Sequence, residues 1–184
     1  MIEIKSLNEF TAARLRALIS GYASPSTYEV TKTESDESTV ISMNLRAIEP
    51  PYIKQWTTLD EEIEYYRKVL EEGLSIGAYD GDNLVGIAIA EKKVWNRTLW
   101  VWEFHVSPDY QNSGIGTQMM ERLVIIGRKN DCRVMVCETQ NTNVPAIRFY
   151  RRVGFEVGAV DLSYYTNNDI TDFEVAVFMK RYIE

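Results

Sequence analysis

Two glycines, Gly114 and Gly116, stand at the head of a run that reads as a helix, in the stretch YQNSGIGTQMMERL. A helix start leaves about four backbone N–H groups unpaired and carries roughly half a positive charge, so it attracts anions. Glycine weakens a helix, but it permits a tight turn and the near approach of a ligand. Loop 111–117 is therefore predicted to hold a pyrophosphate, with a plain strand-to-helix turn as the alternative.

Two other phosphate-binding designs fit this loop poorly. A P-loop requires a lysine directly after its last glycine, and Thr117 follows Gly116 here. A Rossmann fingerprint requires a third glycine where this chain has Met119, although Glu138 lies at a distance suited to a ribose contact. That motif also expects an opening βαβ unit, whereas the pattern here places a hairpin before the loop.

A carboxylate, Glu103, interrupts the apolar stretch LWVWEFHV. Burying it is costly unless it is paired or faces a cavity. An alkyl amine with a pKa near 10.4 is almost entirely ammonium at pH 7, so a nearby carboxylate can both attract it and help to deprotonate it. Glu103 is a candidate amine anchor or general base, with a solvated rim position as the alternative. His105 lies two residues after Glu103, so the two side chains point to the same face of the strand unless a bulge intervenes. His105 is therefore a rival base.

Hydrophobic periodicity predicts the elements that position these residues. Asn8 is expected to cap the first helix and Gly21 to end it, and Pro50-Pro51 is expected to break the structure. The expected strands are 1–7, 38–47, 98–108, 132–139, 155–165 and 173–182, with a hairpin over 74–94 and helices over 8–22, 57–73, 144–154 and from the glycines to about Lys129.

This order predicts an α/β (α+β) fold with helices on both faces of a mixed sheet. Antiparallel strands come first and a βαβ crossover lies in the middle. The whole chain, 1–184, is expected to be one domain, with its core in 74–184 and the first strand and helix in 1–50.

Composition limits the partners. The net charge is −7 with a pI near 4.9 and no basic stripe, which argues against nucleic acid as a partner. No membrane span or signal peptide is evident in the sequence. Cys132, Cys137 and His105 are too few and too badly spaced for a zinc site, so no metal is expected. The two cysteines are expected to be reduced, and together with the lack of an evident signal peptide this predicts a cytoplasmic location.

Two motifs together resemble a known family. The stretch VSPDYQNSGIGTQMM resembles the acetyl-CoA signature of the GNAT N-acetyltransferase superfamily, [QR]-x-x-G-x-[GA] after a strand ending in V-x-P. The stretch NTNVPAIRFYRRVGFE resembles the family's second motif. Within the superfamily, KVWNRTLWVWEFHV and VGAVDLSYY resemble streptothricin acetyltransferases. Those enzymes usually carry an acidic pair where this chain has Trp102 and Glu103, and many carry arginine where it has Gln111.

The resemblance implies a GNAT fold, with about seven strands splayed in the middle of the sheet, and acetyl-CoA as co-substrate. The amide of Val106 would polarise the thioester oxygen. Tyr150 would protonate the departing thiolate, and Glu103 with Trp102 would meet the substrate amine. The residues implied in acetyl-CoA binding are Val106, Gln111, Asn112, Ser113, Gly114, Ile115, Gly116, Thr117, Asn143, Ala146 and Tyr150.

The function expected from the resemblance is direct acetyl transfer, in a ternary complex, to a primary amine of a cationic small molecule such as the β-lysine amine of streptothricin. Such an enzyme would confer antibiotic resistance and act as a monomer or homodimer. The alternatives are a protein N-terminal or lysine acetyltransferase and a non-catalytic acetyl-CoA sensor. The intact Asn143 and Tyr150 argue against the sensor.

Overall fold

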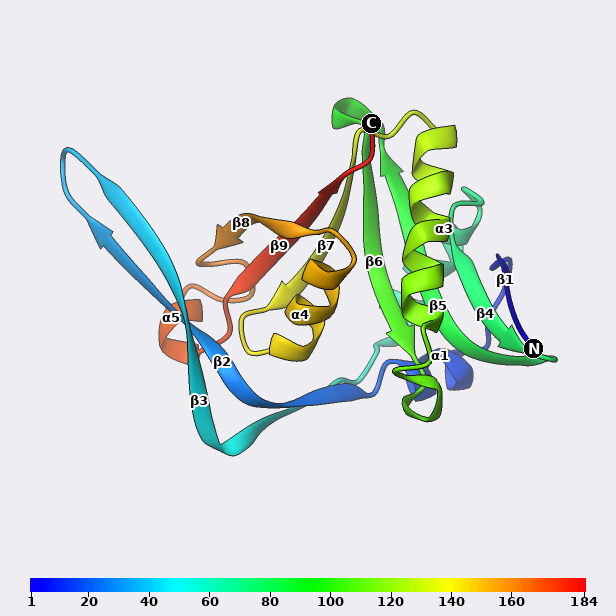
Figure 1. Ribbon diagram of the computed structural model, residues 1–184, viewed down its shortest axis with the longest axis horizontal. Helices are drawn as coiled ribbons and strands as arrows, with labels where there is room; N and C mark the ends of the chain where they lie inside the picture. Colours follow the sequence, from blue (N-terminus) through cyan, green and yellow to red (C-terminus); the bar gives the residue numbers. More distant parts are fainter. The chain divides into compact units, whose positions relative to one another are not determined.

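The computed structural model describes residues 1–184, and Figure 1 shows its elements. The strands are β1 Ile2–Ser6, β2 Gly21–Glu34, β3 Thr39–Gln55, β4 Ile76–Asp80, β5 Asn83–Lys93, β6 Thr98–Val106, β7 Val134–Gln140, β8 Glu156–Asp161 and β9 Ala176–Tyr182. The α-helices are α1 Ala12–Leu18, α2 Asp60–Leu70, α3 Ile115–Lys129, α4 Val144–Arg152 and α5 Asp169–Asp172. Two short 3₁₀ helices span Val94–Asn96 and Pro108–Tyr110.

Seven strands form one mixed sheet in the order β1-β4-β5-β6-β7-β9-β8, and β2 and β3 form a separate two-stranded ribbon. The pairs β1–β4, β4–β5, β5–β6 and β8–β9 are antiparallel. The parallel pair joins the first four residues of β6 to β7, from Thr98 with Val134 to Val101 with Cys137. The predicted mixed sheet of about seven strands is confirmed.

The chain divides into two compact units. The first contains residues 1–20, 56–137 and 181–184, and the second contains residues 21–55 and 138–180.

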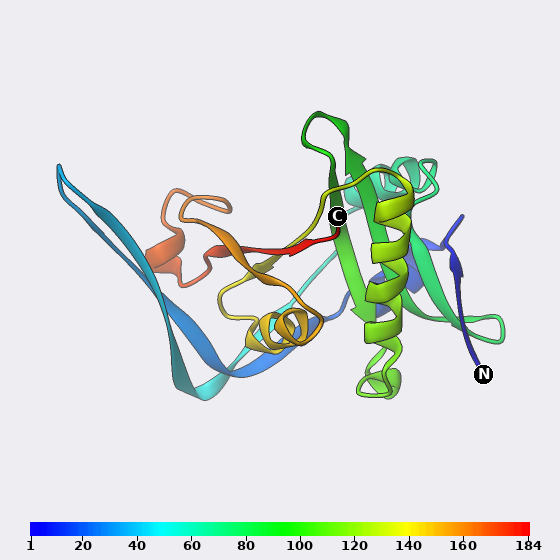
Figure 2. The same cartoon turned by 45° about the horizontal axis from the view of Figure 1, so that its top comes forward.

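The first unit has helices on both faces of its strands. Figures 1 and 2 show α3 lying along β5 and β6. The sulfur of Met119 on α3 lies 3.0 Å from where a Cβ on Gly86 would be, so glycine lets this helix approach β5 closely. Ile87 and Ile89 of β5 point to the other face, where they join the buried side chains of α1 and α2. Alternation along β5 thus gives the sheet a core on each side.

Local sequence features explain where the helix α2 begins and ends. Its first turn is acidic and its last turn is basic, which suits the helix dipole. The Glu62 carboxylate accepts from the Leu59 N–H at 2.6 Å, and Gly73 takes a φ of +69° just past the end. The buried stripe Ile63, Tyr66 and Leu70 faces the core cluster.

In the second unit, the prediction for the early residues was incomplete. The polar segment 21–34 is a strand, β2, and it pairs with β3 far beyond the predicted 38–47. Pro50 and Pro51 lie within β3 and do not end it, so the predicted break was wrong there. The register jumps from Ser24 opposite Tyr52 to Ser26 opposite Ala47. The prolines fall in the stretch that this jump leaves unpaired, because proline has no N–H to donate.

The bounds of the first helix, and the end of the strand expected over 155–165, also differ from the prediction. The first helix begins at Ala12, because the hydroxyl of Thr11, and not Asn8, accepts from the Arg14 N–H at 3.2 Å. Gly21 opens β2. The strand expected over 155–165 ends at Asp161, since Asp169 accepts backbone N–H groups of Tyr165 and Thr166 and folds the following loop.

None of the helices is both long enough and apolar enough to cross a membrane.

Candidate active site

The predicted phosphate loop leads directly into α3. Gly114 caps this helix with a φ of +86°, and Asn112 also takes a positive φ of +59°. A Cβ added to Gly114 would meet only the Nε2 of Gln118, at 3.9 Å. Glycine is therefore required there by the left-handed backbone and not by crowding from the protein. The space in front of Gly114 is open to a ligand.

The start of α3 presents backbone donors. The bond from the Gln118 N–H to the Gly114 carbonyl, 3.1 Å, is the first of the helix, so Ile115, Gly116 and Thr117 have no helical acceptor for their N–H groups. With 15 residues, α3 carries a full helix dipole that favours an anion at this end. These residues fit a pyrophosphate group.

Side chains of the loop stabilise its own backbone. The amide of Gln111 donates to the Val106 carbonyl at 3.0 Å, and the hydroxyl of Ser113 donates to the Tyr110 carbonyl at 2.6 Å. Both side chains are engaged in this way, so they do not compete with the anion for the main-chain N–H groups at the start of α3. The replacement of a family arginine by Gln111 is compatible with this division of roles.

The amide of Val106 points away from β5. The neighbouring Ser107 N–H donates to the Val85 carbonyl of β5 at 2.8 Å, and successive N–H groups of a strand point to opposite edges. The Val106 N–H is thus on the other edge of β6, beyond Val101, where the parallel pairing with β7 ends. This is the orientation that an oxyanion donor at Val106 requires.

Glu103 lies in a network of partly buried donors. Its Oε1 accepts from the Tyr66 hydroxyl at 2.6 Å, and its Oε2 lies 2.7 Å from the Nε2 of His105. The side chains of Glu103 and His105 are each 17% exposed, and the Trp56 ring meets His105 edge-on at 5.9 Å. The alternative that Glu103 occupies a solvated rim position is therefore wrong, because its side chain is largely enclosed and paired.

A bulge in β6 sets this arrangement. Ile89 faces Glu103, whereas the next residue of β5, Ala90, faces Val101, so Trp102 is the extra residue. The bulge precedes Glu103, and the alternation from Glu103 to His105 is preserved. Both side chains consequently point to the same face.

Tyr66 is a functional candidate that the sequence did not single out. Burial, followed by the charge of Glu103 and the hydrogen bond to it, raises the pKa of Tyr66 far above its ordinary value. The phenol therefore stays protonated and remains a donor to Glu103. Its position in the apolar stripe of α2 made it look like a core residue, and only the tertiary contact with β6 distinguishes it.

Trp102 does not contact the carboxylate of Glu103 through its indole nitrogen. Its Nε1 donates to the Oε2 of Glu91, on the neighbouring strand, at 2.8 Å. Trp102, the predicted substrate residue, is thus hydrogen-bonded to a second acid, Glu91, which the sequence did not mark as a site residue.

The second unit carries the other predicted residues. The side chain of Asn143 accepts from the Ala146 N–H at 3.3 Å and caps α4. Tyr150 of α4 is 7% exposed, and its ring lies 5.7 Å from Phe149 and 5.5 Å from Phe155. The structure thus places Asn143, Ala146 and Tyr150 in this unit, and the phosphate loop, Val106 and Glu103 in the first.

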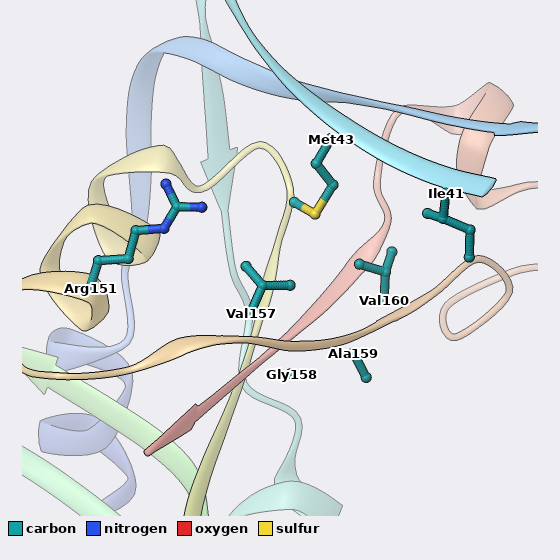
Figure 3. A pocket seen from close by; sticks show the side chains of 7 residues that line it. All are labelled: Ile41, Met43, Arg151, Val157, Gly158, Ala159 and Val160. Atoms are coloured by element: carbon teal, nitrogen blue, oxygen red, sulfur yellow. The ribbon is translucent and has the colours of Figure 1, made fainter. Parts of the chain in front are cut away.

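The second unit also contains an open hollow of about 420 Å³, shown in Figure 3. Ile41 and Met43 of β3 face Val157 and Val160 of β8 across it, with Arg151 of α4 at one end. The guanidinium of Arg151 is engaged by the Tyr28 hydroxyl at 2.8 Å. None of the predicted site residues lines this hollow, so it is separate from the predicted acetyl-transfer chemistry.

The loop that leads into α3 fits a phosphate-bearing ligand. Residues 42–155 match the model of the Acetyltransferase (GNAT) family. The chain therefore belongs to the GNAT family of acetyltransferases, acyltransferases that use acetyl-CoA as co-substrate.

Several known proteins are similar to this chain. It is 30% identical to streptothricin acetyltransferase A of Bacillus subtilis over 128 residues, which cover 70% of this chain and 72% of that protein. The structure of a nourseothricin acetyltransferase superposes with a TM-score of 0.81 at 23% identity, over 100% of this chain and 99% of that one. A Bacillus anthracis protein provisionally named a streptothricin acetyltransferase, in complex with acetyl coenzyme A, superposes with a TM-score of 0.75 at 19% identity, over 100% and 98%. These likenesses confirm the predicted fold.

Proposed function

We propose that this acetyltransferase moves the acetyl group of acetyl-CoA to a primary amine of a cationic small molecule of the streptothricin type, within a ternary complex. The observation that carries the proposal is the largely enclosed carboxylate of Glu103, held by Tyr66 and His105 in an otherwise apolar strand. An enclosed negative charge attracts an ammonium group. The name of the Bacillus subtilis relative supports an antibiotic amine as the acceptor.

In this proposal each residue has a separate task. The N–H groups at the start of α3 bind the pyrophosphate, Asn143 and Ala146 border the pantetheine, and the Val106 N–H polarises the thioester oxygen. Glu103, assisted by His105, receives the proton that the ammonium must lose before its nitrogen can attack.

Tyr150 completes the proton balance. As the bond from nitrogen to the acetyl carbon forms and the carbon–sulfur bond breaks, its hydroxyl gives the sulfur a proton. The proton released from the nitrogen after attack restores the phenol. The sum is one acetyl group moved from sulfur to nitrogen and one proton released to solvent.

The test is a measurement of CoA release by purified protein with acetyl-CoA and streptothricin, together with the resistance of cells that express the protein. A panel of simple amines and peptides with free N-termini is run in parallel. Acetylated antibiotic and resistant cells are expected. Turnover confined to peptides would replace the proposal with a protein acetyltransferase, and acetyl-CoA binding without turnover on any amine would indicate a sensor.

A further inference from the structure

A second acid of the first unit, Glu91 of β5, is surrounded by donors. Its Oε2 accepts from the Trp102 indole at 2.8 Å, from the Tyr65 hydroxyl at 2.9 Å and from the Lys93 ammonium at 2.6 Å. Its side chain is 18% exposed. Burial alone would raise the pKa of Glu91, but these three hydrogen bonds outweigh it and lower the pKa, so the carboxylate is ionised at neutral pH.

Aromatic rings gather at the same place. The Lys93 ammonium lies 5.1 Å from the centre of the Trp102 ring. The Tyr65 ring meets Trp102 edge-on at 5.4 Å, and the Trp100 ring lies 5.6 Å from it. The carboxylate accepts from the indole N–H at the edge of the Trp102 ring, while the ammonium lies over its face. A carboxylate and a tryptophan face that share one ammonium form an arrangement that binds alkylammonium groups. Lys93, which belongs to the same strand as Glu91, shows that an ammonium on an alkyl stem fits there.

The two acids are connected through consecutive residues of α2. Tyr65 donates to Glu91, and Tyr66 donates to Glu103. In the sheet, Glu103 faces Ile89, which is two residues before Glu91. Two residues of a strand span about 7 Å and neighbouring strands lie about 5 Å apart, so the Cα atoms of Glu91 and Glu103 are about 8–9 Å apart. A short alkyl diamine can bridge two carboxylates carried at that spacing.

We propose that Glu91, Trp102 and Tyr65 form a second ammonium subsite, which Lys93 occupies in the free enzyme and from which the substrate displaces it. The acceptor is then a diamine with two ammonium groups on a short alkyl chain. One ammonium lies at Glu103 and is acetylated, and the other lies at Glu91 and is not. The inference rests on the proposed function for the choice of the acetylated amine, but the subsite itself can be tested by binding alone.

The test compares two probes, 1,4-diaminobutane and the matched monoamine 1-aminobutane. Their binding to the CoA-saturated protein is measured by calorimetry in the wild type and in Glu91→Gln, Lys93→Met and Glu121→Gln. Glu121 is the control, because it is an acid of the same unit that lies on α3 and accepts from Arg181 at 2.8 Å. Melting curves check that each variant is folded.

The wild type is expected to bind the diamine more tightly than the monoamine. Glu91→Gln should weaken diamine binding about tenfold and leave monoamine binding within about twofold, because it removes one charge-assisted contact. Lys93→Met should strengthen diamine binding, since it removes the competing ammonium and keeps a similar stem. Glu121→Gln should change neither.

Equal binding of the two probes by the wild type would overturn the subsite, and so would unaltered diamine binding in Glu91→Gln. Both results are independent of turnover. The proposed function is judged separately by CoA release. An enzyme that acetylates amines but binds the two probes equally would keep the proposed function and lose the subsite.

Discussion

The Nε2 of His105 lies 2.7 Å from the Oε2 of Glu103, on one face of β6. The sequence left these residues as rival bases, and the structure makes them partners. A proton taken up by one can be shared with the other, and Tyr66 holds the opposite carboxylate oxygen in place. The chemistry of the acceptor amine is therefore expected to depend on this trio as a unit.

The phosphate loop gives the first prediction. Gly114→Glu should abolish the rise in melting temperature that acetyl-CoA produces in the wild type, because it adds a side chain and a like charge at the anion site. Gly73→Glu is the matched control, since Gly73 also has a positive φ and open space around it but follows α2. Calorimetry that finds equal acetyl-CoA affinity in wild type and Gly114→Glu would refute the loop assignment.

The second prediction concerns Tyr150. The change Tyr150→Phe keeps the ring against Phe149 and Phe155 and removes only the hydroxyl, so the fold should survive. We expect kcat to fall by about 10²-fold with little change in acetyl-CoA affinity, if the hydroxyl protonates the sulfur. Single-turnover kinetics measure the chemical step. A chemical step as fast as that of the wild type would leave Tyr150 with a packing role only.

The third prediction concerns the acid network. Glu103→Gln should lose a charge-assisted contact of about 1.5–3 kcal/mol, which corresponds to about a 10- to 150-fold lower kcat/KM for the amine. Acetyl-CoA affinity, measured by calorimetry, should stay unchanged. Tyr66→Phe should lower kcat/KM by a smaller factor, because Glu103 keeps its charge and its contact with His105. If Glu103→Gln leaves kcat/KM intact, the amine binds elsewhere.

The fourth prediction concerns pH and stability. The pKa of Glu91 is lowered in the folded protein, so its contribution to the free energy of unfolding is present above the unfolded pKa and is lost as pH falls through the folded pKa. Wild type should therefore be more stable than Glu91→Gln at pH 7, and the difference should shrink below about pH 4.5. Urea unfolding at several pH values measures it. A difference that stays constant from pH 7 to pH 3.5 would contradict this origin.

The sequence by itself determined the local features. The periodicity and charge pattern of 57–73 predicted a helix that the structure confirms as α2, and the glycines predicted the start of α3. These features depend on interactions within a few residues: caps, dipoles and the conformational freedom of glycine. The roles of Asn143 and Tyr150 were implied by the family resemblance of one short stretch with a fixed spacing, and they stay predictions.

Only the tertiary structure decided which distant side chains meet. The bulge at Trp102 determines the face of β6 to which Glu103 and His105 point. The residues of β6 do not predict this bulge, because it depends on the register with β5. The strand β2 was missed because its polar residues gain their structure from pairing with β3, up to 34 positions away, and not from their own pattern. Tyr66 reads as a core residue in its helix, and it becomes a donor to Glu103 only because α2 packs on the sheet.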